Sequence, residues 1–203
     1  MEKEMSNSKI EYKDTKVGSI PMNWEVEKLK QIGSLQDGDW ILKSYYQKEG
    51  VRLIQIGDIG IGNFLDKSHK FISENNAQKL NCFFVQPRKD ILISRMPDPI
   101  GRSCIAPQLP YRYIVAVDIT ILRANKDMVD LNYLVFALNS PNFLNLSTRM
   151  AAGATRRRIS KKNLENLPIP LPPLPEQQKI AAILGTVDGA IEKVDLAIEK
   201  TER

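Results

Sequence analysis

The sequence predicts an α+β domain followed by one long helix, and three observations support this. Short apolar runs rich in Ile and Val recur through the first part of the chain and are separated by turn residues, as in a compact sheet domain. Segments with apolar residues at helical spacing lie among them, and a proline-rich segment and a heptad repeat come afterwards. With 203 residues, 42% of them hydrophobic and 26% charged, one domain with an appendage or two very small domains can fold.

The order of the elements can be read from these patterns. Turn residues separate five expected strands, which occupy residues 51–56, 70–72, 90–94, 101–106 and 114–122. One short helix is expected after Ser73, and a second is expected after Asp130, where leucine and valine recur at helical spacing. Ser140 and Pro141 supply a cap and a first-turn proline for a third helix.

The composition changes abruptly at residues 167–175, which form a proline-rich strap. Five of the eight residues 168–175 are proline, and proline excludes a helix interior, so we expect an extended and stiff segment. A plain linker would have this composition too. The alternation of these prolines with Leu167, Ile169, Leu171 and Leu174 favours a strap that packs on the domain.

Residues 176–203 are expected to form one helix, roughly 42 Å long at about 1.5 Å per residue. Its apolar positions follow spacings of 4, 3, 4, 3 and 4, and these positions are Ile180, Leu184, Val187, Ile191, Val194 and Ile198. This heptad seam predicts pairing with a second long helix. The alternative is an amphipathic helix that folds onto its own domain. Gly185 and Gly189 weaken the helix but permit close backbone approach.

The net charge of +5 is unevenly distributed along the chain. Residues 86–162 contain 13 basic and 5 acidic side chains, whereas residues 176–203 contain 4 basic and 6 acidic ones. Within the basic part, one short stretch has no acidic residue and includes Arg149, Arg156, Arg157, Arg158, Lys161 and Lys162. Such a cluster is typical of polyanion binding, although a solvated surface loop can have the same composition.

The residues required by several other chemistries are missing from the sequence. It contains no phosphate-binding glycine loop, no methyltransferase NPP[FY] tetrapeptide and no complete PD-(D/E)xK nuclease motif. Cys82, Cys104 and the single His69 do not form a metal or disulfide pattern, so no cofactor or metal is expected. Neither a secretory signal nor an apolar run of about 18 residues is found, which favours a cytoplasmic protein without a membrane span. These observations favour a binding protein over an enzyme.

Several segments resemble one known family. The stretch NLENLPIPLPPLPEQQKIAAILGTVDGAIEKVD, residues 163–195, closely resembles the conserved region of type I restriction-modification specificity subunits. Upstream, IPMNWEVEKLKQIGSLQDG, VRLIQIGDI and DILISRMPDPIGRSCIA resemble the family's entry segment, an early strand, and a strand, glycine loop and strand. YLVFALNS and AAGATRRRIS fit the family as well, and the resemblance covers about residues 17–203.

The resemblance implies a division of the chain and a function. It implies an N-terminal extension (1–16), a target recognition domain with a curved mixed β-sheet and peripheral helices (17–166), the strap (167–175) and a conserved coiled-coil spacer helix (176–203). Members of the family are non-catalytic. They choose the DNA target for an adenine methyltransferase (M) subunit and a restriction/translocase (R) subunit, and double-stranded DNA is therefore an expected partner.

The family normally has two such units in tandem, whereas this chain contains one, which fits a natural half-subunit, the product of a truncated gene or an expressed fragment. A half-subunit would have to form a homodimer through its helix, and its twofold symmetry would match a palindromic bipartite DNA site. The alternatives are a stand-alone DNA-binding dimer that acts as a decoy or regulator, and a small enzyme with an unrecognised site.

Candidate DNA contacts come from three segments. The six basic residues of 149–162 are candidates for phosphate contacts, together with Arg95 and Arg102 from the glycine loop. The polar and aromatic loop 39–47 is a candidate for entering a groove, through Lys43, Tyr45, Tyr46 and Gln47. An ordinary exposed loop with Trp40 in the core is the alternative. The DNA sequence recognised is not predicted.

Overall fold

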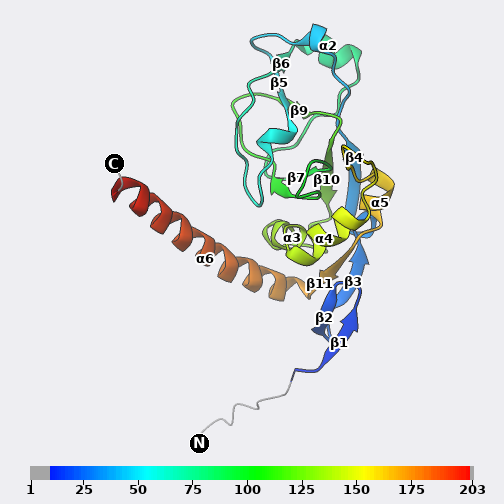
Figure 1. Ribbon diagram of the computed structural model, residues 1–203, viewed down its shortest axis with the longest axis vertical. Helices are drawn as coiled ribbons and strands as arrows, with labels where there is room; N and C mark the ends of the chain where they lie inside the picture. The colour runs from blue at the N-terminus through cyan, green and yellow to red at the C-terminus, as the bar shows by residue number, and fades with distance from the viewer. Residues whose placement is uncertain (1–9, 202–203) are drawn as a thin grey trace, which may run out of the picture.

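The computed structural model describes residues 10–201 and confirms the predicted α+β class with a long final helix (Figure 1). The β-strands and short helices form one body, and helix α6 (Leu174–Thr201) projects away from it. At one end lies a hairpin of β1 (Tyr12–Thr15) and β2 (Gly18–Pro21). The predicted boundary between residues 16 and 17 falls inside this hairpin.

The centre of the body is a four-stranded antiparallel sheet in the order β4-β10-β7-β8. Its strands are β4 (Gly33–Asp37), β10 (Ile119–Ala124), β7 (Asp90–Ser94) and β8 (Ser103–Ile105). Successive residues of β7 point to opposite faces, so Ile91 and Ile93 join the core cluster beneath α3 (Leu131–Leu138) and α4 (Pro141–Arg149). Leu92 joins the cluster on the other side. Both faces of this sheet are therefore covered.

A second, three-stranded sheet has the order β6-β5-β9 and lies at the end opposite the hairpin (Figure 1). It consists of β6 (Phe71–Ile72), β5 (Val51–Ile54) and β9 (Tyr113–Val115). The β5–β9 pair is parallel and the β5–β6 pair is antiparallel, so the sheet is mixed. The single strand expected at 114–122 is wrong, because the chain turns at 116–118 and its two halves, β9 and β10, enter different sheets.

The three predicted helices form, and the predicted cap Ser140 is confirmed. Ser73, Asp130 and Ser140 each accept a hydrogen bond from a backbone amide in the first turn of α2 (Glu74–Lys79), α3 (Leu131–Leu138) and α4 (Pro141–Arg149). Two four- to five-residue helices, α1 (Leu29–Ile32) and α5 (Lys161–Glu165), were not predicted. Two 3-10 turns, η1 (Lys43–Tyr45) and η2 (Ile56–Asp58), complete the helical elements.

The proline-rich strap packs on the domain, as its alternating pattern favoured. Residues 168–171 form strand β11 (Pro168–Leu171), which pairs antiparallel with β3 (Glu25–Lys28). The side chains of Ile169 and Leu171 are buried in the main core. Two-stranded pairing leaves one edge of β11 free, which is where a strand tolerates prolines.

Among the described residues, helix α6 packs into the core of the domain near its start. The side chain of Gln177 is fully buried; its Oε1 accepts from Asp130 N at 2.9 Å, and its Nε2 donates to Met128 O at 3.1 Å and Pro172 O at 2.8 Å. Ile180, the first seam residue, packs against the core. The other five seam residues are 38–57% exposed, so beyond this start the helix does not fold onto its own domain.

Replacement of Gln177 by Ala should lower the free energy of unfolding by about 2 kcal/mol, because three buried hydrogen bonds are lost and their backbone partners are left unsatisfied. Urea denaturation followed by circular dichroism measures this. The neighbouring Gln178 is exposed, so Gln178→Ala is the matched control and should change the free energy by less than about 0.5 kcal/mol. Equal effects of the two substitutions would contradict the anchoring role of Gln177.

Candidate nucleic-acid interface

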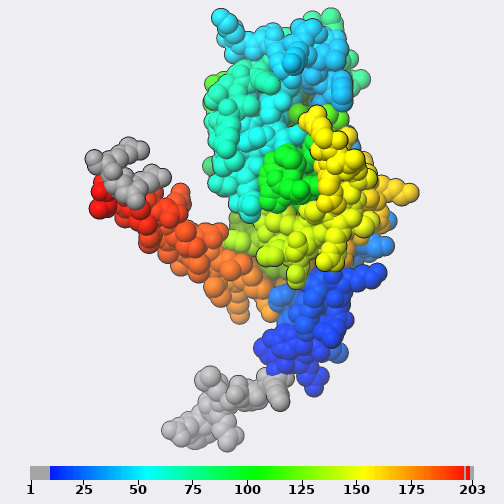
Figure 2. All heavy atoms as spheres, viewed as in Figure 1, coloured from blue at the N-terminus to red at the C-terminus, as the bar shows by residue number. Residues whose placement is uncertain are grey.

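The basic stretch predicted from the sequence forms the loop between α4 and α5, drawn in yellow in Figure 2. Backbone hydrogen bonds in both directions join Ala152 and Arg158, at 3.1 and 2.9 Å, and close the base of the loop. Residues 153–157 form its tip. Gly153 has a φ of +114°, and a Cβ there would lie 2.6 Å from Arg156 O, so a side chain at this position would strain the turn.

Four of the six basic residues predicted in this stretch are exposed. They are Arg149, Arg156, Arg157 and Lys162, and we call them the exposed basic group. Within residues 10–201 none of the four forms an ion pair. Arg157 Nη2 donates to the backbone oxygen of Thr148 at the end of α4, which holds its guanidinium at the surface. The group can therefore meet an external anion without first breaking an internal ion pair.

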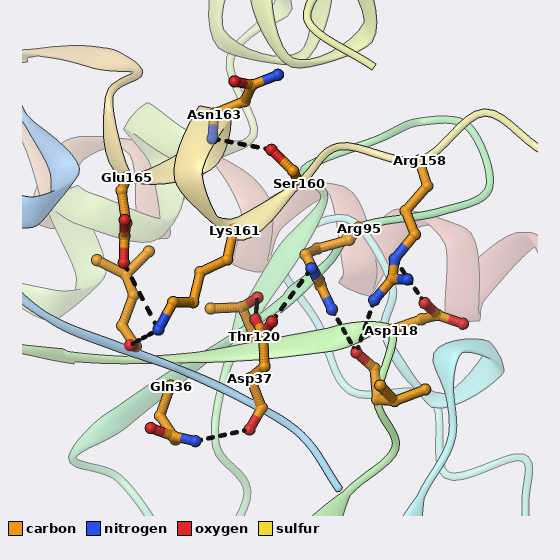
Figure 3. Close-up of polar contacts among 12 residues, drawn as sticks. Gln36, Asp37, Arg95, Asp118, Thr120, Arg158, Ser160, Lys161, Asn163 and Glu165 are labelled. Carbon is orange, nitrogen blue, oxygen red and sulfur yellow. Dashed lines mark hydrogen bonds and ion pairs between the residues drawn. The ribbon is translucent and has the colours of Figure 1, made fainter. Parts of the chain in front are cut away.

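The other two basic residues of the stretch already have partners (Figure 3). Arg158 forms an ion pair with Asp118, with Nε 2.8 Å from Oδ1, and donates from Nη2 to Val117 O at 3.3 Å. Lys161 Nζ donates to Leu35 O at 3.2 Å and lies 3.7 Å from a carboxylate oxygen of Glu165. These side chains hold the ends of the loop against the sheet.

Arg95 and Arg102 do not lie at the surface, which does not support their predicted phosphate contacts. Arg95 is 3% exposed; its Nη1 lies 3.3 Å from Asp37 Oδ2, and its Nη2 donates to Val117 O. Burial lowers the pKa of Arg95 below its ordinary value; Asp37 opposes this shift and Arg158 adds to it. We assign Arg95 to the interior rather than to DNA.

Arg102 is 8% exposed and lies beneath the loop 97–101. Its guanidinium donates to four backbone oxygens, those of Ile59 at 2.8 Å, Pro97 at 2.7 Å, Ile56 at 3.2 Å and Pro99 at 3.4 Å. Burial lowers the pKa of this side chain as well. Because its donors are used in joining two loops, Arg102 holds the glycine loop in place and is not assigned to DNA either.

The predicted groove-entering loop is partly packed. Tyr45 and Tyr46 lie against the core of the second sheet, and the ammonium of Lys70 is 5.1 Å from the ring centroid of Tyr46. Lys43 and Gln47 are exposed, and Gln47 Nε2 donates to Glu49 O at 2.6 Å. Lys43 and Gln47 therefore remain the accessible candidates of this loop.

Trp40 is 72% exposed, so the alternative that places it in the core is wrong. Its indole is an accessible aromatic group within the predicted loop, and no local sequence pattern marks this exposure. The acids that hold the arginines, Asp37 and Asp118, were likewise not predicted. Each is distant in sequence from its partner, and no local motif marks the pairing.

The described part of the chain contains neither a cluster of possible metal ligands nor a helix able to span a membrane. Residues 10–201 contain no group of three or more His, Cys, Asp and Glu side chains that could hold a metal ion. His69 is exposed, and its Nδ1 lies 3.1 Å from Nη1 of the buried Arg52, which also pairs with Asp66 at 2.8 Å. No helix of the described residues is long and apolar enough to span a membrane.

Comparisons with known proteins give one family. The model for the type I restriction modification DNA specificity domain matches residues 21–200. The type I restriction enzyme MjaVIII specificity subunit of Methanocaldococcus jannaschii is 27% identical over 202 residues, which cover 95% of this chain and 46% of that protein. The chain thus spans about half the length of the curated relatives that it matches.

Solved structures share the fold. A chain from a type I R-M system, studied for its complex assembly and conformational transition, has a TM-score of 0.68 and is 25% identical; the match covers 90% of this chain and 43% of that one. The HsdS subunit from Thermoanaerobacter tengcongensis has a TM-score of 0.65 at 24% identity, covering 88% of this chain and 40% of that one. These likenesses confirm the predicted domain with its long C-terminal helix.

Proposed function

The chain belongs to the family of type I restriction modification DNA specificity domains, and on this premise we propose that it binds double-stranded DNA and selects one half of a bipartite target. The family resemblance seen in the sequence is thereby confirmed. The proposal gives the chain a recognition role with no catalytic step of its own. The adenine methyltransferase (M) and the restriction/translocase (R) subunits are its proposed partners.

The exposed basic group is the observation that carries the DNA-binding proposal. Arg156 and Arg157 lie at the loop tip, and Arg149 and Lys162 flank it on α4 and α5. Arginine presents several N–H donors to phosphate oxygens and can also bind a guanine edge through two parallel hydrogen bonds. Hydrogen bonds and an ion pair fix the base of the loop to the sheet, so the positions of these charges are restricted.

Helix α6 supports a second part of the proposal, pairing with a copy of itself. The seam spacings of 4, 3, 4, 3 and 4 read the same in both directions, so an antiparallel pair centred on Gly189 places every seam residue opposite another. The layers are Ile180 with Ile198, Leu184 with Val194, and Val187 with Ile191. The resulting twofold symmetry matches a palindromic bipartite target.

Replacement of both Arg156 and Arg157 by Ala should weaken binding to duplex DNA and reduce the slope of log affinity against log salt by about 2, close to one for each lost phosphate contact. Fluorescence anisotropy over a salt series measures both quantities. The control, Lys179→Ala, removes an exposed charge from α6 and should leave the slope unchanged. An unchanged slope in the double variant would rule out the tip as the phosphate contact.

Replacement of Leu184 by Asp should abolish self-association, because it buries an unpaired charge in the seam opposite Val194. Sedimentation velocity distinguishes monomer from dimer. Thr186→Asp adds the same charge to α6 at an exposed position outside the seam and should leave the dimer intact. If wild type and Leu184→Asp sediment as the same species, α6 does not pair through this seam.

A further inference from the structure

Two arginines from separate segments converge on the turn between β9 and β10 (Figure 3). Arg95 follows β7 and Arg158 closes the basic loop, and both donate to the backbone oxygen of Val117. Each also has its own carboxylate, Asp37 for Arg95 and Asp118 for Arg158. We call Asp37, Arg95, Asp118 and Arg158 the arginine latch.

The latch is linked through the backbone as well as through side chains. Arg95 N donates to Asp118 O at 2.9 Å, and Ile159 N donates to Arg95 O at 3.2 Å. Thr120 Oγ1 donates to Asp37 Oδ1 at 2.9 Å and so orients the carboxylate that faces Arg95. Four segments distant in sequence, the end of β4, the end of β7, the β9–β10 turn and the basic loop, are therefore joined at one point.

Arg158 lies at the base of the loop, directly after the tip residues 153–157. Its backbone closes the loop base with Ala152, and the next residue toward the tip is Arg157. If Arg158 can no longer pair with Asp118, the base of the loop keeps the two backbone hydrogen bonds between Ala152 and Arg158. It loses the ion pair that joins it to the β9–β10 turn. The tip then has more conformations available, and only a fraction of them present Arg156 and Arg157 in the same place.

We infer that Asp118 and Arg158 are positioning residues for DNA binding, which hold the tip in its binding conformation without contacting DNA. This inference rests on the proposed DNA-binding function of the tip. It has an unusual consequence for Asp118. On charge alone, a carboxylate beside a basic loop opposes DNA binding, so its removal should strengthen binding. As a positioning residue it has the opposite effect, and its removal weakens binding.

The test is Asp118→Asn, with affinity measured by anisotropy on a fluorescein-labelled DNA duplex of mixed sequence. Loss of a partly exposed ion pair is expected to lower affinity by a factor on the order of five, with the salt slope unchanged because no phosphate contact is lost. The control is Asp98→Asn. Asp98 is an exposed carboxylate near the end of α4, where it accepts a 3.3 Å hydrogen bond from Thr148 Oγ1. Its removal should leave affinity unchanged or raise it.

A second readout does not depend on DNA. Trypsin cleaves after arginine, and a released tip should be cut faster after Arg156 and Arg157 in Asp118→Asn than in wild type, while the thermal transition of the domain is retained. Arg158→Lys keeps the charge but loses the guanidinium fork that reaches Asp118 and Val117 together, so it should show the same faster cleavage. If Asp118→Asn does not fold, the rate of tryptic cleavage of Arg158→Lys tests the inference instead.

Tighter DNA binding by Asp118→Asn, with tryptic cleavage at the wild-type rate, would overturn the inference. Failure of the proposed function gives a different result. In that case wild type and the Arg156 and Arg157 double variant bind DNA equally, and the cleavage rates still decide whether the latch holds the tip.

Discussion

The turn at residues 116–118 is the constraint on which the rest of the domain depends, because both sheets meet there. Ala116 N donates to Ile54 O in the second sheet, and Gly38 N donates to Ile119 O in the first. Gly38 lies so close that a Cβ would be 2.3 Å from Ala116 O, so only glycine fits against the turn. The same turn offers Val117 O and Asp118 to the arginine latch. The geometry of the basic loop is thus tied to the junction of the two sheets.

The parts of the fold that could be predicted from sequence are those with local causes. Ser73, Asp130 and Ser140 cap their helices through contacts within three residues, and the heptad spacing of α6 depends on that helix alone. The split of 114–122 into β9 and β10 has no Gly or Pro to mark it, since the turn is imposed by the different partners of its two halves. Elements of four or five residues, such as α1 and α5, carry too few positions to show a period.

The same distinction between local and long-range causes applies to the residues of the candidate site. Composition located the basic loop, because a cluster of arginines without acids can be read directly from the sequence. Composition could not distinguish the exposed Arg156 and Arg157 from Arg158, which is paired with Asp118, because Asp118 is 40 residues away in the sequence. Arg95 and Arg102 resembled surface arginines of a glycine loop, but their burial depends on Asp37, Val117 and Ile59, which only the folded chain brings together.

In the proposed function, this chain chooses the DNA sites that an adenine methyltransferase partner modifies. We would coexpress the chain with the adenine methyltransferase subunit of a type I system, test for copurification, and map methylated adenines across the host genome. We expect a stable complex and methylation within one two-part palindromic motif, and we expect this methylation to be absent when the chain is omitted. Methylation at the same sites without the chain, or a methyltransferase that does not copurify with it, would contradict the account.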